Sequence, residues 1–127
     1  MGLDERLYSQ RPVLTSTGRE DRRVHRTGRG RSLRDWQTIV TECAVSHGFD
    51  WTTGEVDTML LRIHSEVSEA GEALRDEDWT TFAEELADIF IRLVNCAEVM
   101  GVDLEGEVIA KHAKNMQRPR LHGKARK

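Results

Sequence analysis

Residues 66–88 read EVSEAGEALRDEDWTTFAEELAD, and this stretch decides the fold. It holds two pairs of acids, each pair spaced three residues apart: Glu66, Glu69, Glu85 and Asp88. The inner acids of the two pairs lie eight residues from Glu77, on opposite sides, and the outer acids lie eleven residues from it. An α-helix rises about 1.5 Å per residue, so two antiparallel helices joined at 76–78 would bring all four carboxylates to similar heights. The stretch therefore predicts a helical hairpin with an acidic band across it.

The rest of the chain extends this hairpin into an all-α subunit. Apolar residues recur at helical spacing in four segments, which predict helices over 33–47, 55–75, 79–100 and 104–117. Ser32 is the expected N-cap of the first helix, with Asp35 in the role of the capping-box acid and Gly48 just past its end. Asp103 is the expected N-cap of the last helix. We predict a four-helix subunit built around a central antiparallel helical hairpin.

Composition divides the chain into two parts. Residues 1–31 are rich in arginine and lack a sustained period, which predicts a basic, flexible N-terminal extension. Residues 32–127 form the predicted helical domain, which ends in a basic C-terminal loop. Apolar residues make up 38% of the 127, a low share for a compact domain, so we expect oligomerisation to complete the core, as a dimer or tetramer.

Charge and hydropathy narrow the classes of function. Residues 35–110 carry eighteen acids and three arginines, whereas 111–127 carry seven Lys and Arg and no acid. This distribution suits a metal site facing a phosphate-binding end and disfavours nucleic acid as a partner. The two cysteines form no metal-binding motif, and no apolar run approaches a membrane span, so we predict a cytoplasmic protein with no membrane partner.

Four clustered carboxylates predict a divalent cation, because they would otherwise repel one another. Oxygen ligands favour Mg²⁺, with Mn²⁺ as an alternative, and the spacing offers no Cys or His that would suit zinc. Near the C-terminus, Lys111, Asn115 and Arg118 follow the i, i+4, i+7 spacing of one helix face, where cations and an amide could bind phosphate. Acids spaced three residues apart on a helix also occur as a solvated face, and that reading stays open.

The motif Glu66-x-x-Glu69, fifteen residues, then Glu85-x-x-Asp88, followed by the basic face on the last helix, resembles the MazG-type all-α nucleoside triphosphate pyrophosphohydrolases. The resemblance covers about residues 33–124. It implies an oligomeric helical enzyme that uses Mg²⁺ to convert an NTP or dNTP and water into the monophosphate and pyrophosphate. By that resemblance the four acids are the catalytic metal ligands, and Lys111, Asn115 and Arg118 contact the phosphates. Trp36, Trp51 and Trp79 are candidates for base contacts, although the helical spacing of Trp36 favours a core position and we expect Trp79 to pack at the end of the hairpin instead.

Two other functions remain open at this point. Phosphoribosyl-ATP pyrophosphatase is a similar helical enzyme with another substrate. A non-catalytic helical interaction module, with acids that are merely exposed, belongs to a different class and would show no metal dependence. Among the four acids, we expect Glu66 to orient the attacking water, although the sequence leaves the choice open.

Overall fold

The computed structural model describes residues 30–119, and within this range the chain is helical and contains no strand. Its elements are α3 (Leu33–Ser46), the short 3₁₀ helix η1 (Thr53–Glu55), α4 (Val56–Arg75), α5 (Trp79–Val99) and α6 (Leu104–Met116). The predicted all-α fold is confirmed. The predicted N-terminal extension up to residue 29, and the basic C-terminal loop from residue 120, lie outside the described residues.

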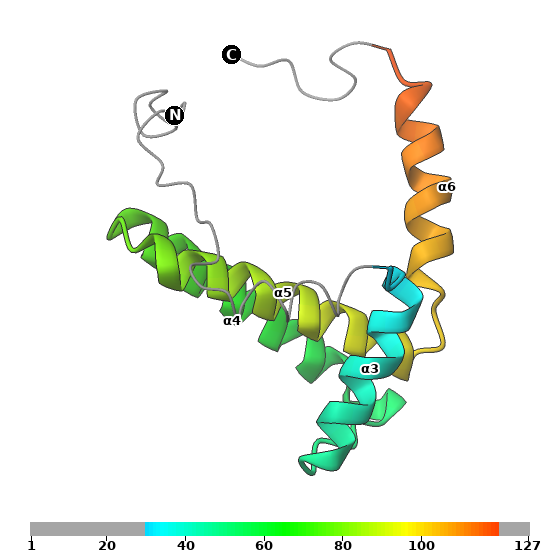
Figure 1. The fold of residues 1–127 in the computed structure, drawn as a ribbon, viewed down its shortest axis with the longest axis horizontal. Coiled ribbons are helices and arrows are strands. Elements are labelled where there is room, and N and C mark those ends of the chain that lie inside the picture. The colour runs from blue at the N-terminus through cyan, green and yellow to red at the C-terminus, as the bar shows by residue number, and fades with distance from the viewer. Residues whose placement is uncertain (1–29, 120–127) are drawn as a thin grey trace.

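Helices α4 and α5 form the predicted antiparallel hairpin and pack along their length (Figure 1). Glu77 has a φ of 56°, a left-handed conformation that allows a tight reversal between the helices. Asp78 begins α5 as its N-cap, since its carboxylate accepts hydrogen bonds from the backbone N–H and the hydroxyl of Thr81. Trp79 packs its ring edge-on against Phe82 at this end of the hairpin.

Helix α3 packs across the second half of α5 (Figure 1). It lies on the side of α5 away from much of α4. Four consecutive α5 residues, Val94–Ala97, are therefore buried, because α3 and α4 cover different faces of the same turn. The helical period of the apolar residues of α5 predicts that Leu86 and Leu93 lie on one stripe that faces the core. That prediction is only partly right: Leu86 and Leu93, both predicted inside, are 49% and 40% exposed.

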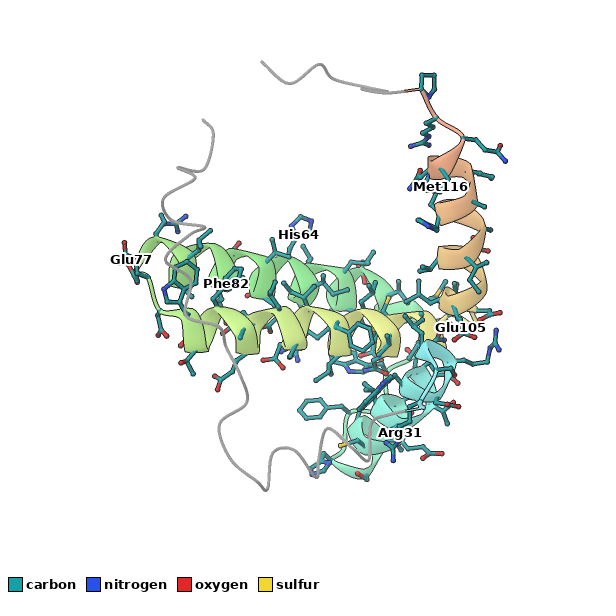
Figure 2. All side chains as sticks on the ribbon, turned by 45° about the horizontal axis from the view of Figure 1, so that its top comes forward. Arg31, His64, Glu77, Phe82, Glu105 and Met116 are labelled. Carbon is teal, nitrogen blue, oxygen red and sulfur yellow. The ribbon has the colours of Figure 1, made fainter. Side chains whose placement is uncertain are left out.

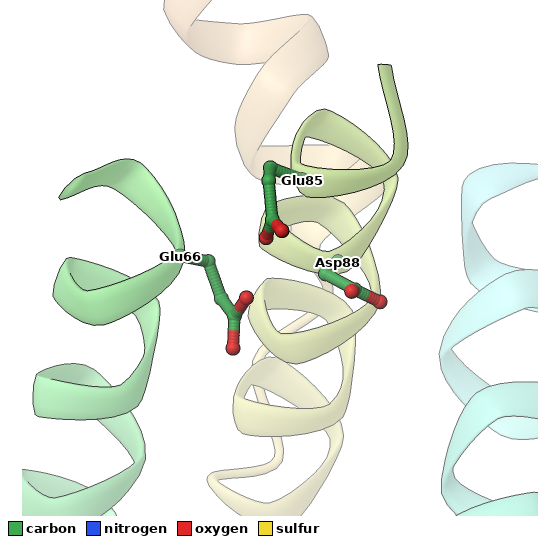
Figure 3. A group of neighbouring side chains, drawn as sticks. All are labelled: Glu66, Glu85 and Asp88. Atoms are coloured by element: carbon green, nitrogen blue, oxygen red, sulfur yellow. The ribbon is translucent and has the colours of Figure 1, made fainter. Parts of the chain in front are cut away.

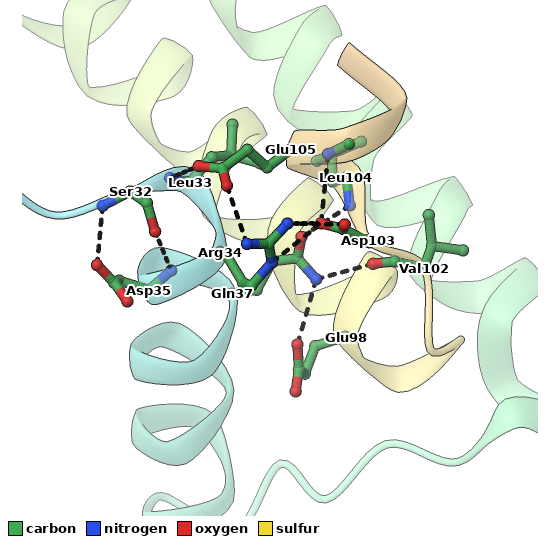
Figure 4. Close-up of polar contacts among 11 residues, drawn as sticks. Ser32, Leu33, Arg34, Asp35, Gln37, Glu98, Val102, Asp103, Leu104 and Glu105 are labelled. Carbon is green, nitrogen blue, oxygen red and sulfur yellow. Dashed lines mark hydrogen bonds and ion pairs between the residues drawn. The ribbon is translucent and has the colours of Figure 1, made fainter. Parts of the chain in front are cut away.

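A polar joint fixes the start of α6 against the start of α3 (Figure 4). The buried Gln37 amide donates to the Val102 carbonyl at 2.9 Å, and its Oε1 accepts from the Leu104 N–H at 3.0 Å. On the surface, Arg34 binds the Asp103 carboxylate through two nitrogens. Asp103 also caps α6 by accepting from the Gly106 N–H, as predicted. These bonds set the direction in which α6 leaves the body.

Helix α6 extends away from the hairpin, and its residues from Glu107 onward are exposed (Figures 1 and 2). Figure 2 shows Met116 near its far end, well separated from Phe82 and Glu77 at the turn of the hairpin. The spacing of Val108 and Met116 predicts an inward apolar face on this helix, but neither side chain is covered within the described chain. No helix among the described residues is both long and apolar enough to cross a membrane.

Candidate active site

Three of the four predicted acids meet between the hairpin helices. Glu66, Glu85 and Asp88 each offer a carboxylate oxygen, and these oxygens lie within 4.8 Å of one another. Figure 3 shows Glu66 extending from α4 toward α5, which carries the other two. Glu66 is buried, Glu85 is half-buried and Asp88 is exposed, so the group opens from the interior toward solvent. We refer to these three residues as the acid group.

The other predicted site residues have different positions. Glu69 lies one turn from Glu66 on α4, is exposed, and does not belong to the acid group. Lys111, Asn115 and Arg118 are exposed on and just after α6, which extends away from the α4–α5 hairpin (Figure 1). Their roles as ligand and phosphate contacts therefore stay predictions.

The electrostatics of the acid group centre on Glu85. A side-chain contact with Glu66, partial burial, and the negative charges of Glu69 and Asp88 together raise the pKa of Glu85 to about 7. Its Oε2 atom is buried, and no hydrogen-bond donor reaches it from the described residues. A carboxylate oxygen left in this way is an open ligand position, and the oxygen-only donor set of the acid group suits a hard divalent cation such as Mg²⁺.

One cation of the chain already touches the acid group. The Nε atom of Arg92 lies 2.6 Å from Oε1 of Glu66, whose side chain is only 8% exposed. Burying a carboxylate this deeply costs several kcal/mol unless a charge partner offsets it. Arg92 therefore explains how Glu66 stays inside the hairpin.

A cavity of about 570 Å³ opens beside the acid group. It lies between α3 and the hairpin, and Asp88 and Arg92 form part of its wall. The two tryptophans predicted as base contacts, Trp36 and Trp51, both line it. Volumes of about 300–1,000 Å³ are typical of small-molecule sites, so this cavity could hold a ligand whose charged end reaches Asp88.

Several other residues line this cavity that the sequence pattern alone does not single out. Phe49 also lines it and stacks on Trp51, with ring centroids 6.4 Å apart and planes 16° from parallel. Arg62 lines it too, with its guanidinium 5.0 Å from the centroid of Trp51. A pattern in the sequence could have found the arginines, because Arg62 and Arg92 each lie fifteen residues from Glu77 and continue the symmetric spacing of the acids.

Comparison with known families agrees with this geometry. Residues 55–122 match the MazG nucleotide pyrophosphohydrolase domain, which spans the hairpin with its acid group and continues through α6. No curated protein and no solved structure matches the chain significantly. The family match covers more than half of the chain, and α3, which builds one wall of the cavity, lies ahead of it. From its acidic hairpin and this match, the chain belongs to the MazG nucleotide pyrophosphohydrolase domain family.

Proposed function

We propose that this chain is a Mg²⁺-dependent nucleoside triphosphate pyrophosphohydrolase, which hydrolyses an NTP or dNTP to the monophosphate and pyrophosphate. One observation carries the proposal: Asp88 belongs both to the acid group and to the wall of an aromatic-lined cavity. A site of this form can hold a base in the cavity while the phosphates reach the carboxylates.

The acid group is the proposed place for the cation. Glu66, Glu85 and Asp88 would hold it, and Glu69, one turn away, is the proposed fourth ligand. When bound there, Mg²⁺ would polarise the phosphate and lower the pKa of a coordinated water. The buried, unpaired Oε2 of Glu85 supports this assignment, because a cation would give that atom the partner it lacks. Mn²⁺ is a suitable replacement ion, since it accepts the same oxygen ligands.

Other side chains of the protein would bind the base and orient the attacking water. Trp36 and Trp51 would stack on the base, and such stacking contributes about 1–3 kcal/mol per base in proteins that bind single-stranded nucleic acids. Glu66 faces the other two carboxylates across the hairpin and remains our candidate for orienting the attacking water and accepting its proton. The water would form a new bond to the α-phosphorus. The bond from the α-phosphorus to the bridging oxygen would break, and pyrophosphate would leave.

We further propose that the active form is an oligomer of this chain. The hairpin exposes apolar side chains at matching heights, with Leu60 near the level of Leu93 and Val67 near that of Leu86. Helix α6, with Lys111, Asn115 and Arg118, also lacks a covering element within the described residues. A second copy could bury the exposed apolar side chains of the hairpin and bring its own α6 cations to the phosphates. Light scattering tests this, and a chain that stays monomeric with substrate would contradict it.

The activity is tested by pyrophosphate release from a panel of NTPs, dNTPs and phosphoribosyl-ATP, with and without Mg²⁺. Asp88→Asn and Glu85→Gln should each reduce release at least about 100-fold, because even indirect support of a metal ligand is worth 10–100-fold. Glu84→Gln is the matched control: it removes a neighbouring exposed acid outside the acid group and should keep the rate.

Circular dichroism should show the same helix content in all three variants. Full release from Asp88→Asn and Glu85→Gln, or release unaffected by a chelator, would refute the proposal. Absence of metal-dependent turnover for every substrate would instead favour a non-catalytic interaction module.

A further inference from the structure

Two arginines form a basic level directly beside the acid group. Arg62 precedes Glu66 by four residues on α4, and Arg92 follows Asp88 by four residues on α5. Because each lies fifteen residues from Glu77, the antiparallel hairpin places them at the same height, about one helical turn beyond the acids. Both line the cavity. The hairpin thus places two positive charges in the cavity wall, about one helical turn from its carboxylates.

The two arginines differ in what they contact. The Arg62 guanidinium lies over the ring of Trp51, whereas Nε of Arg92 lies 2.6 Å from Oε1 of Glu66. This second contact is incomplete, because the buried Nε of Arg92 has no partner that satisfies hydrogen-bond geometry within the described chain. The positive charge of the guanidinium offsets the charge of Glu66, but the Nε–H group does not point at the carboxylate. A buried donor in this state favours any acceptor that can reach it.

Glu66 cannot serve Arg92 and a divalent cation equally well. Two positive charges on one carboxylate repel each other, and the repulsion is stronger inside a protein than in water. The Arg92 side chain can leave Glu66 and turn into the cavity, since it is 35% exposed and already lines the cavity. A phosphate in the cavity would offer paired oxygen acceptors, which match the planar donor fork of a guanidinium.

We propose that Arg92 is the resident counter-ion of Glu66 in the metal-free protein and becomes a phosphate contact once a divalent cation occupies the acid group. This inference rests on the proposed function, and it makes Arg92 the residue that couples the two ligands. Metal binding releases Arg92 for phosphate, and phosphate binding removes the competitor for Glu66. By linkage, each ligand then raises the affinity for the other by the same factor.

The first test measures Mn²⁺ affinity by electron paramagnetic resonance of the full chain, without nucleotide. Arg92→Gln should bind Mn²⁺ about tenfold more tightly than the wild type, because an adjacent opposite charge changes the proton affinity of a carboxylate by about ten- to a thousandfold and Arg92 is partly solvated. Arg92→Lys keeps the charge and should stay within about twofold of the wild type. Arg62→Gln is the matched control, since it removes one charge at the same height without touching Glu66, and should gain less than about threefold.

The second test asks where Arg92 goes, with inorganic pyrophosphate as the probe. In saturating Mg²⁺, Arg92→Gln should bind pyrophosphate about tenfold more weakly than the wild type, because a charge-assisted bidentate contact is lost. The coupling between Mn²⁺ and pyrophosphate should fall in the same variant, to the part that direct contact between the phosphate and the cation supplies. Equal Mn²⁺ affinity in Arg92→Gln and Arg62→Gln, or weaker binding in the former, would overturn the inference.

A measurement on the wild type keeps the inference testable even if Arg92→Gln unfolds. The Nε resonance of Arg92, assigned by its absence from the spectrum of Arg92→Lys, should shift when Mg²⁺ is added and shift again with pyrophosphate. A resonance that ignores both ligands would refute the exchange of partners. A wild-type chain that binds no Mn²⁺ at all would contradict the proposed function itself, and so differs from a failure of this inference alone.

Discussion

Metal binding should depend steeply on pH, and the structure sets the scale. Glu85 has a pKa of about 7 in the metal-free protein, chiefly because of its contact with Glu66 and its partial burial. A cation must displace that proton before it can bind. The apparent Mn²⁺ affinity should therefore rise about tenfold per pH unit well below pH 7 and about fivefold between pH 6 and pH 7, as expected for one competing proton. Above pH 7 only about a twofold gain remains, because half of the Glu85 carboxyls are already ionised at the pKa.

The assay is a Mn²⁺ titration at half-unit steps from pH 5.5 to pH 8.5. Glu85→Gln cannot release a proton and should lose the steep region, whereas Glu84→Gln should keep it. If the wild-type affinity changes less than about threefold between pH 5.5 and pH 7, Glu85 is not the titrating ligand and the reasoning is wrong.

The same group gives the metal-free protein an opposite pH dependence. A carboxyl whose pKa is raised on folding, here from 4.5 to about 7, holds its proton better in the folded chain than in the unfolded chain. Its contribution to stability is complete below about pH 4.5 and is lost as the pH rises through 7. The melting temperature without metal should fall across this window, and Glu85→Gln should flatten the fall.

Three further predictions concern the joint, the core and the cavity. Gln37→Ala should lower the free energy of unfolding by about 2–3 kcal/mol in urea titrations, because the Leu104 N–H loses its buried acceptor, whereas Thr38→Ala on the exposed side of α3 should change it little. Replacing Val94, which has 0% exposure, by Ala should lower the free energy of unfolding by about 2 kcal/mol. An unchanged urea midpoint would contradict its place in the core. Trp51→Leu should raise KM for the preferred nucleotide about tenfold and leave Mn²⁺ affinity within about twofold; a parallel loss of metal affinity would argue against a base contact.

Local chemistry made much of the fold predictable. Ser32 and Asp35 form the expected capping box, since each side chain accepts from the other's backbone N–H. Gly48 has a φ of 87°, as expected for the residue that follows a helix. The approach of Glu66 to Asp88 was predictable for a similar reason, because a short turn fixes the register of an antiparallel hairpin.

Other features depend on neighbours that a single helix does not reveal. The period of α5 predicts one apolar face, but α3 and α4 cover it from two directions, so Asn95 is buried along with Val94. Thr41 of α3 donates a hydrogen bond to Asn95 and compensates for this burial. The cavity could not be predicted from the sequence either, because it exists only where α3 crosses the hairpin. The contact of Arg92 with Glu66 depends on how deeply Glu66 is buried, and the spacing of the acids does not reveal that burial.

The polar joint around Gln37 has a mechanical consequence. Helix α6 has 13 residues and is therefore a rod of about 20 Å held at one end. A tilt of about 10° at the joint would sweep its tip through about 3.5 Å, more than the length of a hydrogen bond. Small changes near Gln37 would then be amplified at Asn115, and the stiffness of this hinge would govern how reproducibly the distant cations are aimed.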